Sequence, residues 1–241
     1  LITAPLTALG GSSVIQYAGY FPITSGYTAS AFFEIPFTSL ARCILVDNGP
    51  NGFTYSDQLD NAAWTKISVT VTANASTAAD GTATADKVVE TTATDSHRLT
   101  QSITVGAAAA DYVLGGEFQI GNGRNFVELI LNEGSANAYQ YFNLSTGAVG
   151  STGGVGAAWS NLRPFIKALG NGWYYCAIVV RKTSASTSIN GYAFIGSADG
   201  TDSYTGSTSN YLNARRMFIA QSSLPIRPGS TTTTATTGTA Q

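Results

Sequence analysis

The chain has 241 residues, of which 44% are hydrophobic and only 11% are charged, and its formal net charge is −2 at pH 7. This length is enough to bury a core as one large β domain with extensions. The only adjacent basic pairs are Arg181-Lys182 and Arg215-Arg216, which argues against nucleic acid as a partner. No run approaches the roughly 18 apolar residues that span a bilayer, so we expect no membrane association.

Residues 1–50 differ from the rest of the chain. Val14–Tyr20 and Ala29–Ile35 predict two strands, which are too few for a sandwich of their own. We therefore expect residues 1–50 to be an N-terminal arm or assembly segment that packs on a neighbour. The N-terminus is apolar but has no positively charged region, which makes it a poor signal peptide.

Residues 51–228 carry the pattern of strands and turns. Runs rich in Val, Ile, Thr, Tyr and Phe are separated by Gly, Asn, Asp and Ser, including turn pairs such as Asp80-Gly81. One helical turn is expected at Asp57–Trp64. About ten strands predict an all-β, two-sheet antiparallel sandwich. The expected strands are Ser68–Ala73, Lys87–Glu90, Arg98–Thr104, Tyr112–Gln119, Phe126–Leu131, Ala138–Asn143, Phe165–Ala168, Trp173–Arg181, Ser188–Ile195 and Asn210–Gln221.

Residues 229–241 are rich in threonine and have no apolar anchor. Such a segment does not bury enough apolar surface to fold alone. We expect an extended C-terminal tail that a partner subunit holds in place.

A series of short motifs runs along the sandwich region, beginning with Tyr55–Lys66 (YSDQLDNAAWTK). It continues with Val69–Asn74, Asp80–Lys87, Ser96–Ser102, Tyr141–Val149, Gly170–Cys176, Ala198–Thr201 and Ala220-Gln221. Their order and spacing resemble a family of jelly-roll domains in virion proteins of tailed bacteriophages and prophages, similar in fold to carbohydrate-binding modules. The family usually continues Ala-Gln with Leu-Glu, whereas Ser222-Ser223 follow here.

The resemblance implies a jelly roll and a place in the virion, as a tail fibre, baseplate, collar or capsid decoration subunit made in the host bacterial cytoplasm. Other virion proteins would be its partners. A homo-oligomer, for instance a trimer, and contact with host surface polysaccharide fit this setting. The alternative is a carbohydrate-binding module of a secreted bacterial enzyme that degrades polysaccharide.

Four aromatic residues are candidates for sugar binding, because flat rings stack on pyranose faces. Alternation along two strands places Tyr139 and Tyr141 on one outward face, and Trp173 and Tyr175 on another. If these strands are neighbours, the four rings form one glycan platform. The competing interpretation is that another subunit or a loop covers this face.

Turn carboxylates are candidates for a structural calcium, which prefers carboxylate and carbonyl oxygens from loops. Such carboxylates are Asp80, Asp199 and Asp202. The competing interpretation is that Asp and Gly only satisfy turn geometry there. No other cofactor is expected.

No catalytic residues are predicted. Asp95, Ser96 and His97 are consecutive, and side chains that alternate along a strand do not converge into a triad. Carboxylates that could serve a glycosidase are sparse. Cys43 and Cys176 are interpreted as free thiols, with a disulfide as the other option.

Overall fold

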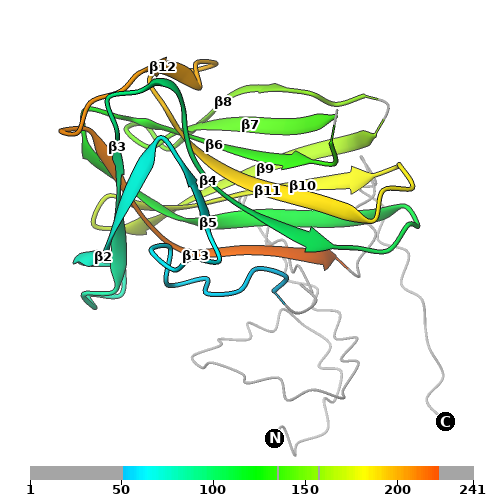
Figure 1. The fold of residues 1–241 in the computed structure, drawn as a ribbon, viewed down its shortest axis with the longest axis horizontal. Helices are drawn as coiled ribbons and strands as arrows, with labels where there is room; N and C mark the ends of the chain where they lie inside the picture. Colours follow the sequence, from blue (N-terminus) through cyan, green and yellow to red (C-terminus); the bar gives the residue numbers. More distant parts are fainter. Residues whose placement is uncertain (1–50, 135, 157, 223–241) are drawn as a thin grey trace, which may run out of the picture. The chain divides into compact units, whose positions relative to one another are not determined.

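A computed structural model describes residues 51–134, 136–156 and 158–222. The predictions for residues 1–50, for the Thr-rich tail and for Cys43 lie outside these residues. The described chain contains thirteen strands and no helix, so it has no helix that could cross a membrane (Figure 1). The strands are β1 (Thr65–Ile67), β2 (Val69–Ser76), β3 (Ala85–Glu90), β4 (Thr94–Thr104), β5 (Ala110–Asn122), β6 (Phe126–Asn132), β7 (Asn137–Asn143), β8 (Ala148–Gly153), β9 (Trp159–Gly170), β10 (Trp173–Lys182), β11 (Ser188–Gly196), β12 (Ser203–Thr205) and β13 (Tyr211–Ser222).

The strands form two antiparallel sheets that pack face to face, as predicted. One sheet has the order β1-β4-β11-β6-β7-β8, with β12 added on β4. The other has the order β2-β3-β13-β5-β10-β9. Neighbours within each sheet are mostly distant in sequence, which is consistent with a jelly roll.

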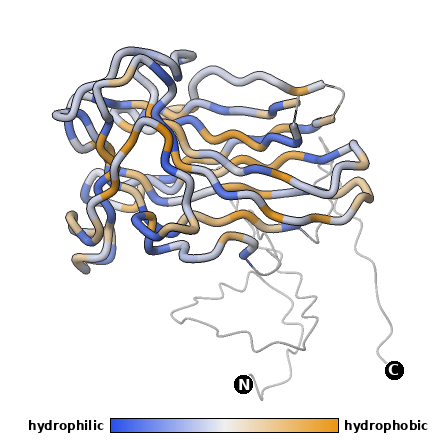
Figure 2. The backbone as a smooth tube through the Cα atoms, viewed as in Figure 1, coloured by the Kyte–Doolittle hydropathy of each residue, from blue (hydrophilic) through white to orange (hydrophobic). Residues whose placement is uncertain are grey.

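The core lies between the sheets because alternate residues of each strand point inward. Leu114, Phe118 and Ile178 face it from the six-stranded sheet, and Leu129 and Phe142 from the seven-stranded sheet. Figure 2 shows hydrophobic residues recurring along the strands. Cys176 is a free thiol buried in this core, and burial raises its pKa.

All ten predicted strands occur, with shifted ends. Three further strands, β1, β8 and β12, were not predicted, because they are short or rich in glycine and polar residues. The helical turn expected at Asp57–Trp64 is wrong. Three successive turns replace it, in which the N–H groups of Gln58, Asn61 and Trp64 donate to the carbonyls three residues earlier.

A buried carboxylate fastens the loops at one end of the six-stranded sheet. Glu90 on β3 is 1% exposed and accepts hydrogen bonds from Arg124 (2.5 and 3.1 Å), the Tyr204 hydroxyl (2.7 Å) and the Ser207 amide (3.0 Å). Burial alone would raise the pKa of Glu90, but these partners outweigh it and hold the pKa below its ordinary value. One side chain thus ties together three segments.

Replacing Glu90 with Gln should therefore destabilise the fold strongly. The variant leaves the half-buried Arg124 guanidinium without its counter-charge, and we expect a loss of about 3 kcal/mol in the free energy of unfolding at pH 7. Because the pKa of Glu90 is lowered on folding, its contribution is present above the ordinary carboxyl pKa and is lost as the pH falls. Urea denaturation at pH 7 and pH 4 measures both effects. Lys167→Gln on β9, an exposed change, is the control, and equal losses in the two variants would contradict the assignment.

Candidate functional site

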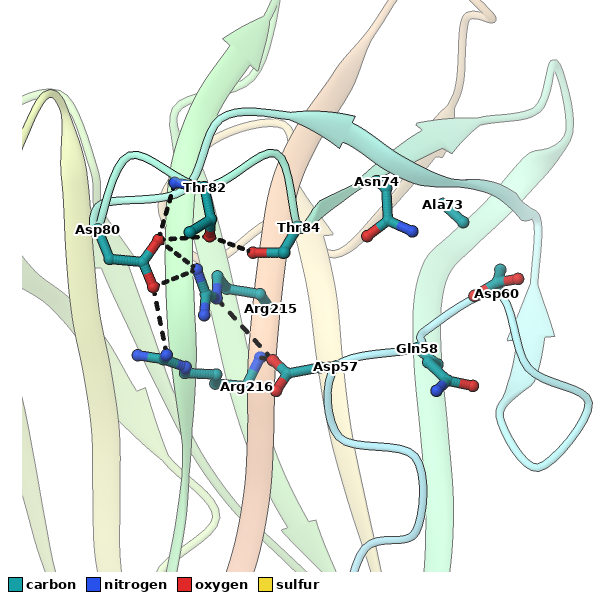
Figure 3. A pocket seen from close by; sticks show the side chains of 10 residues that line it. All are labelled: Asp57, Gln58, Asp60, Ala73, Asn74, Asp80, Thr82, Thr84, Arg215 and Arg216. Carbon is teal, nitrogen blue, oxygen red and sulfur yellow. Dashed lines mark hydrogen bonds and ion pairs between the residues drawn. The ribbon is translucent and has the colours of Figure 1, made fainter.

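An open pocket of about 570 Å³ lies next to the point where the pairing of β3 with β13 ends. The pairing of β13 with β3 ends at Ala214 opposite Asp86. Further along β13, the loop that precedes β1 takes over, with the Met217 amide donating to the Ser56 carbonyl. The pocket lies between the end of the β3–β13 pairing and the loop that precedes β1 (Figure 3). Its lining residues are Asp57, Gln58, Asp60, Ala73, Asn74, Asp80, Thr82, Thr84, Arg215 and Arg216.

Two irregular stretches of strand form opposite walls of the pocket. The pairing of β2 with β3 shifts register between Thr72 and Ser76, and Asn74 there has φ +51°. The pairing of β13 with β5 shifts between Arg215 and Phe218, and Arg216 there has φ +49°. Left-handed backbone at a residue other than glycine is uncommon and concentrates at functional sites, as bulges do.

The bulge in β13 brings two consecutive arginines into one network. Regular alternation would send Arg215 and Arg216 to opposite faces of the sheet. Instead both guanidinium groups contact Asp80, at 3.1 and 3.3 Å, and both contact Glu117 on β5, at 3.6 and 3.2 Å. The Arg216 amide also donates to Asp57 (3.1 Å), which fixes the bulge against the loop.

Asp80 is the centre of this network (Figure 3). Its carboxylate accepts hydrogen bonds from the hydroxyl and the amide of Thr82, at 2.6 and 3.1 Å, and from Arg215. Hydrogen bonds from Thr82 and then the charge of Arg215 lower the pKa of Asp80 to about 2. It is therefore ionised at any ordinary pH and holds the two arginines in place.

The other end of the pocket carries polar groups that are not bonded to the protein. The side chains of Gln58, Asp60 and Asn74 have no hydrogen-bond partner among the described residues, and no dashed line reaches them in Figure 3. All three residues are exposed. Two amides and one carboxylate are thus available to a ligand.

A buried aspartate behind the pocket fixes the backbone of this end. Asp86 is 1% exposed and accepts hydrogen bonds from the amides of Leu59 (2.7 Å) and Asn74 (2.9 Å). Burial raises its pKa above the ordinary value. The loop and the β2 bulge are therefore both anchored to β3, which holds the open end of the pocket in one shape.

The four predicted aromatic residues are not brought together. Tyr139 and Tyr141 lie on β7 of the seven-stranded sheet, whereas Trp173 and Tyr175 lie on β10 of the other sheet. The condition for a single platform, that the two strands are neighbours, is not met. Trp173 is 1% exposed and its indole donates to the Thr77 carbonyl (3.0 Å), which makes it a packing residue.

The tyrosines of these pairs have different surroundings. The Tyr175 ring is stacked on Phe218, with centroids 6.1 Å apart, and has Phe165 at its edge. Tyr141 is 2% exposed, and Tyr139 meets it edge to face at 6.1 Å. Sequence alternation placed these rings outward correctly, but it did not reveal how far their neighbours cover them.

Glu128 on β6 lies beside Tyr141 and is 2% exposed. Burial raises its pKa, a hydrogen bond from Tyr141 lowers it and the Asp202 charge raises it further, to a value of about 8. One of its oxygens, Oε2, has no hydrogen-bond partner. A carboxyl in this position is easier to bury as the neutral acid.

The three predicted calcium ligands lie apart. Asp80 is held by Thr82 and the two arginines, Asp199 accepts hydrogen bonds from Ser151 (2.7 and 3.0 Å), and Asp202 lies near Glu128. Within the described part of the chain, no group of three or more His, Cys, Asp or Glu side chains is arranged so that it could hold a metal ion. The turns at Asp80 and Asp199 thus use their carboxylates for protein hydrogen bonds.

The single histidine, His97, makes no hydrogen bond to Asp95 or Ser96. His97 on β4 is 0% exposed and stacks on Tyr204, with ring centroids 4.7 Å apart. Neither ring nitrogen has a hydrogen-bond partner among the described residues. The Ser96 hydroxyl accepts from Arg98, and the Asp95 carboxylate accepts from Ser68 and from the amide and hydroxyl of Ser96. Because neither Asp95 nor Ser96 bonds to His97, the three residues form no relay.

Sequence reasoning identified only part of the pocket. It singled out Asp80 as a turn carboxylate and Arg215-Arg216 as a basic pair, but it did not connect them. The feature of the sequence that could have revealed the pocket is the pair of adjacent arginines in a strand, because two adjacent residues share one face of a sheet only where the strand is irregular. Nothing in the sequence pattern located the irregularity.

The buried Glu128 predicts a pH dependence of stability. A carboxyl whose pKa is raised on folding binds its proton more tightly in the folded state, so the free energy of unfolding falls as the pH rises from about 4.5 to about 8. We expect Glu128→Gln to remove this fall, which is on the order of 3 kcal/mol. Urea denaturation at pH 5 and pH 8 measures the difference. A variant as pH-dependent as the parent would show that Glu128 is not the group responsible.

No model of a known protein family matches the chain, and no curated protein matches it. Among solved structures it is similar to TmCBM61 in complex with beta-1,4-galactotriose, with 14% identity and a TM-score of 0.42 over 72% of this chain and 99% of that one. It is also similar to the enzymatically active domain of tailspike protein 4 of bacteriophage CBA120, with 14% identity and a TM-score of 0.41 over 71% of this chain. The chain spans about a fifth (21%) of that tailspike chain.

Proposed function

We propose that the chain is a non-catalytic structural subunit of a bacteriophage particle that binds host surface glycans in the pocket lined by β2, β13 and the loops before β1 and β3. The observation that carries the glycan part is the free polar end of the pocket, with Gln58, Asp60 and Asn74 facing an open volume of about 570 Å³. This volume lies within the usual range for small-molecule sites.

The chemistry of the lining favours a ligand rich in hydroxyl groups. Most ligand pockets are lined mainly by apolar side chains, whereas only Ala73 is apolar here. Amide groups donate and accept hydrogen bonds, and a carboxylate accepts them, so each suits a sugar hydroxyl. Because the backbone of this wall is anchored through Asp86, binding a ligand orders only the side chains of these groups and not the backbone that carries them.

The place in a virion rests on the resemblance that begins at Tyr55–Lys66. A particle carries many copies of such a subunit, and many weak pockets acting together give firm adhesion. Residues 1–50 and the Thr-rich tail would then attach the subunit to other virion proteins or to copies of itself. Host surface polysaccharide is the ligand that this setting supplies.

The rival proposal is a carbohydrate-binding module of a secreted polysaccharide-degrading enzyme. It makes the same use of the pocket and differs only in what the chain is attached to. Light scattering on the full chain and mass spectrometry of purified virions separate the two. An oligomer found in virions supports the structural subunit, and a stable monomer absent from every particle supports the module.

Glycan binding is tested by substitution at the free end of the pocket. We expect Gln58→Ala to weaken binding of the full chain to immobilised host polysaccharide several-fold, since one lost hydrogen bond is worth about 0.5–1.5 kcal/mol. Gln221→Ala, an exposed change outside the pocket lining, is the matched control. Equal affinity of the two variants would place the binding site elsewhere, and the absence of binding to any polysaccharide would refute the proposed function.

A further inference from the structure

We infer that the pocket selects uncharged glycans and rejects glycans that carry carboxylate or sulfate groups, with Asp60 as the residue that determines this specificity. The inference rests on the proposed function and adds the class of ligand. It follows from how the charges of the pocket are distributed between its two ends.

Both guanidinium groups of the pocket already form ion pairs with carboxylates of the protein. The Arg215 side chain is 4% exposed and has three carboxylates around it, from Asp57 (3.9 Å), Asp80 (3.1 Å) and Glu117 (3.6 Å). Arg216 is more exposed, but its two terminal nitrogens contact Glu117 (3.2 Å) and Asp80 (3.3 Å). An anionic ligand would have to compete with these fixed carboxylates for each guanidinium group.

The formal charge of the site is negative. Four carboxylates, from Asp57, Asp60, Asp80 and Glu117, stand against two guanidinium groups, an excess of two negative charges. Asp80 contributes its charge at any ordinary pH because its pKa is about 2. A second anion brought within about 4 Å of such a charge meets a repulsion of about 1 kcal/mol even in bulk water, and more in a partly enclosed site.

The side chains at the other end of the pocket offer hydrogen bonds but no positive charge. Gln58 and Asn74 are neutral, and Asp60 has a carboxylate with no hydrogen-bond partner among the described residues. A sugar hydroxyl donates to this carboxylate, whereas a sugar carboxylate or sulfate has no hydrogen to offer it. Discrimination of this kind depends on a repulsive contact with the wrong ligand as much as on attraction to the right one.

The test uses one oligosaccharide in two forms, an uncharged hexose oligomer that the full chain binds and the same oligomer oxidised at C6 to the uronic acid. We expect the uncharged form to bind about tenfold more tightly in about 20 mM NaCl, and the ratio to shrink in about 500 mM NaCl as the charges are screened. Asp60→Asn should shrink the ratio in low salt by strengthening binding of the acidic form. Asp95→Asn, the same change of charge outside the pocket lining, should leave it as it was.

The outcomes separate the inference from the proposed function. Binding of the acidic form as tight as or tighter than that of the uncharged form, with loss of that binding in Arg216→Ala, overturns the inference and leaves glycan binding intact. A ratio that Asp60→Asn and Asp95→Asn change equally assigns the discrimination to net charge and also overturns it. If no glycan of either kind binds, the proposed function itself fails.

Discussion

Burial of charged groups in a β-sandwich constrains how its loops are built. Asp86, Glu90, Lys182 and Arg215 are each 0–4% exposed, and a charge taken out of water is strongly unfavourable unless partners replace the water. Asp86, Glu90 and Arg215 bind segments that are distant in sequence, and Lys182 binds both the Ala107 carbonyl and the loop that follows its own strand. The Lys182 ammonium, for example, donates to the carbonyls of Ser184 and Ser186 at 2.8 Å and so sets the turn between β10 and β11.

The pocket is a consequence of the same constraint. The buried Asp86 carboxylate accepts hydrogen bonds from the amides of Leu59 and Asn74. These two bonds hold the loop before β1 and the irregular part of β2 against β3. The buried guanidinium group of Arg215 is stabilised by carboxylates, and the bulge in β13 places both Arg215 and Arg216 in ion pairs with Asp80. The pocket lies between these two buried groups, and the side chains of Gln58, Asp60 and Asn74 at its other end are exposed. Glu128 has no cationic partner among the described residues, and its carboxyl responds with a raised pKa instead.

The two edges of the six-stranded sheet carry features that block pairing with another chain. An exposed edge strand invites pairing with another chain, and proteins block such edges with proline, lysine or irregular strands. β9, at one edge of the six-stranded sheet, carries Pro164 and Lys167, and β2, at the other edge, is irregular near Asn74. Both edges of this sheet are therefore poorly suited to strand addition by another chain.

The sequence by itself determined the fold class and most of the strands, because a two-residue alternation of apolar side chains is a local signal that survives without knowledge of the partners. It also placed Phe142 and Ile178 inward and Tyr139 and Tyr175 outward. Only the tertiary structure decided which strands are neighbours, and this separated Tyr141 from Trp173. Likewise, it alone decided the bulge that gives Arg215 and Arg216 one shared face, since a register shift depends on the pairing strand and leaves no periodic trace.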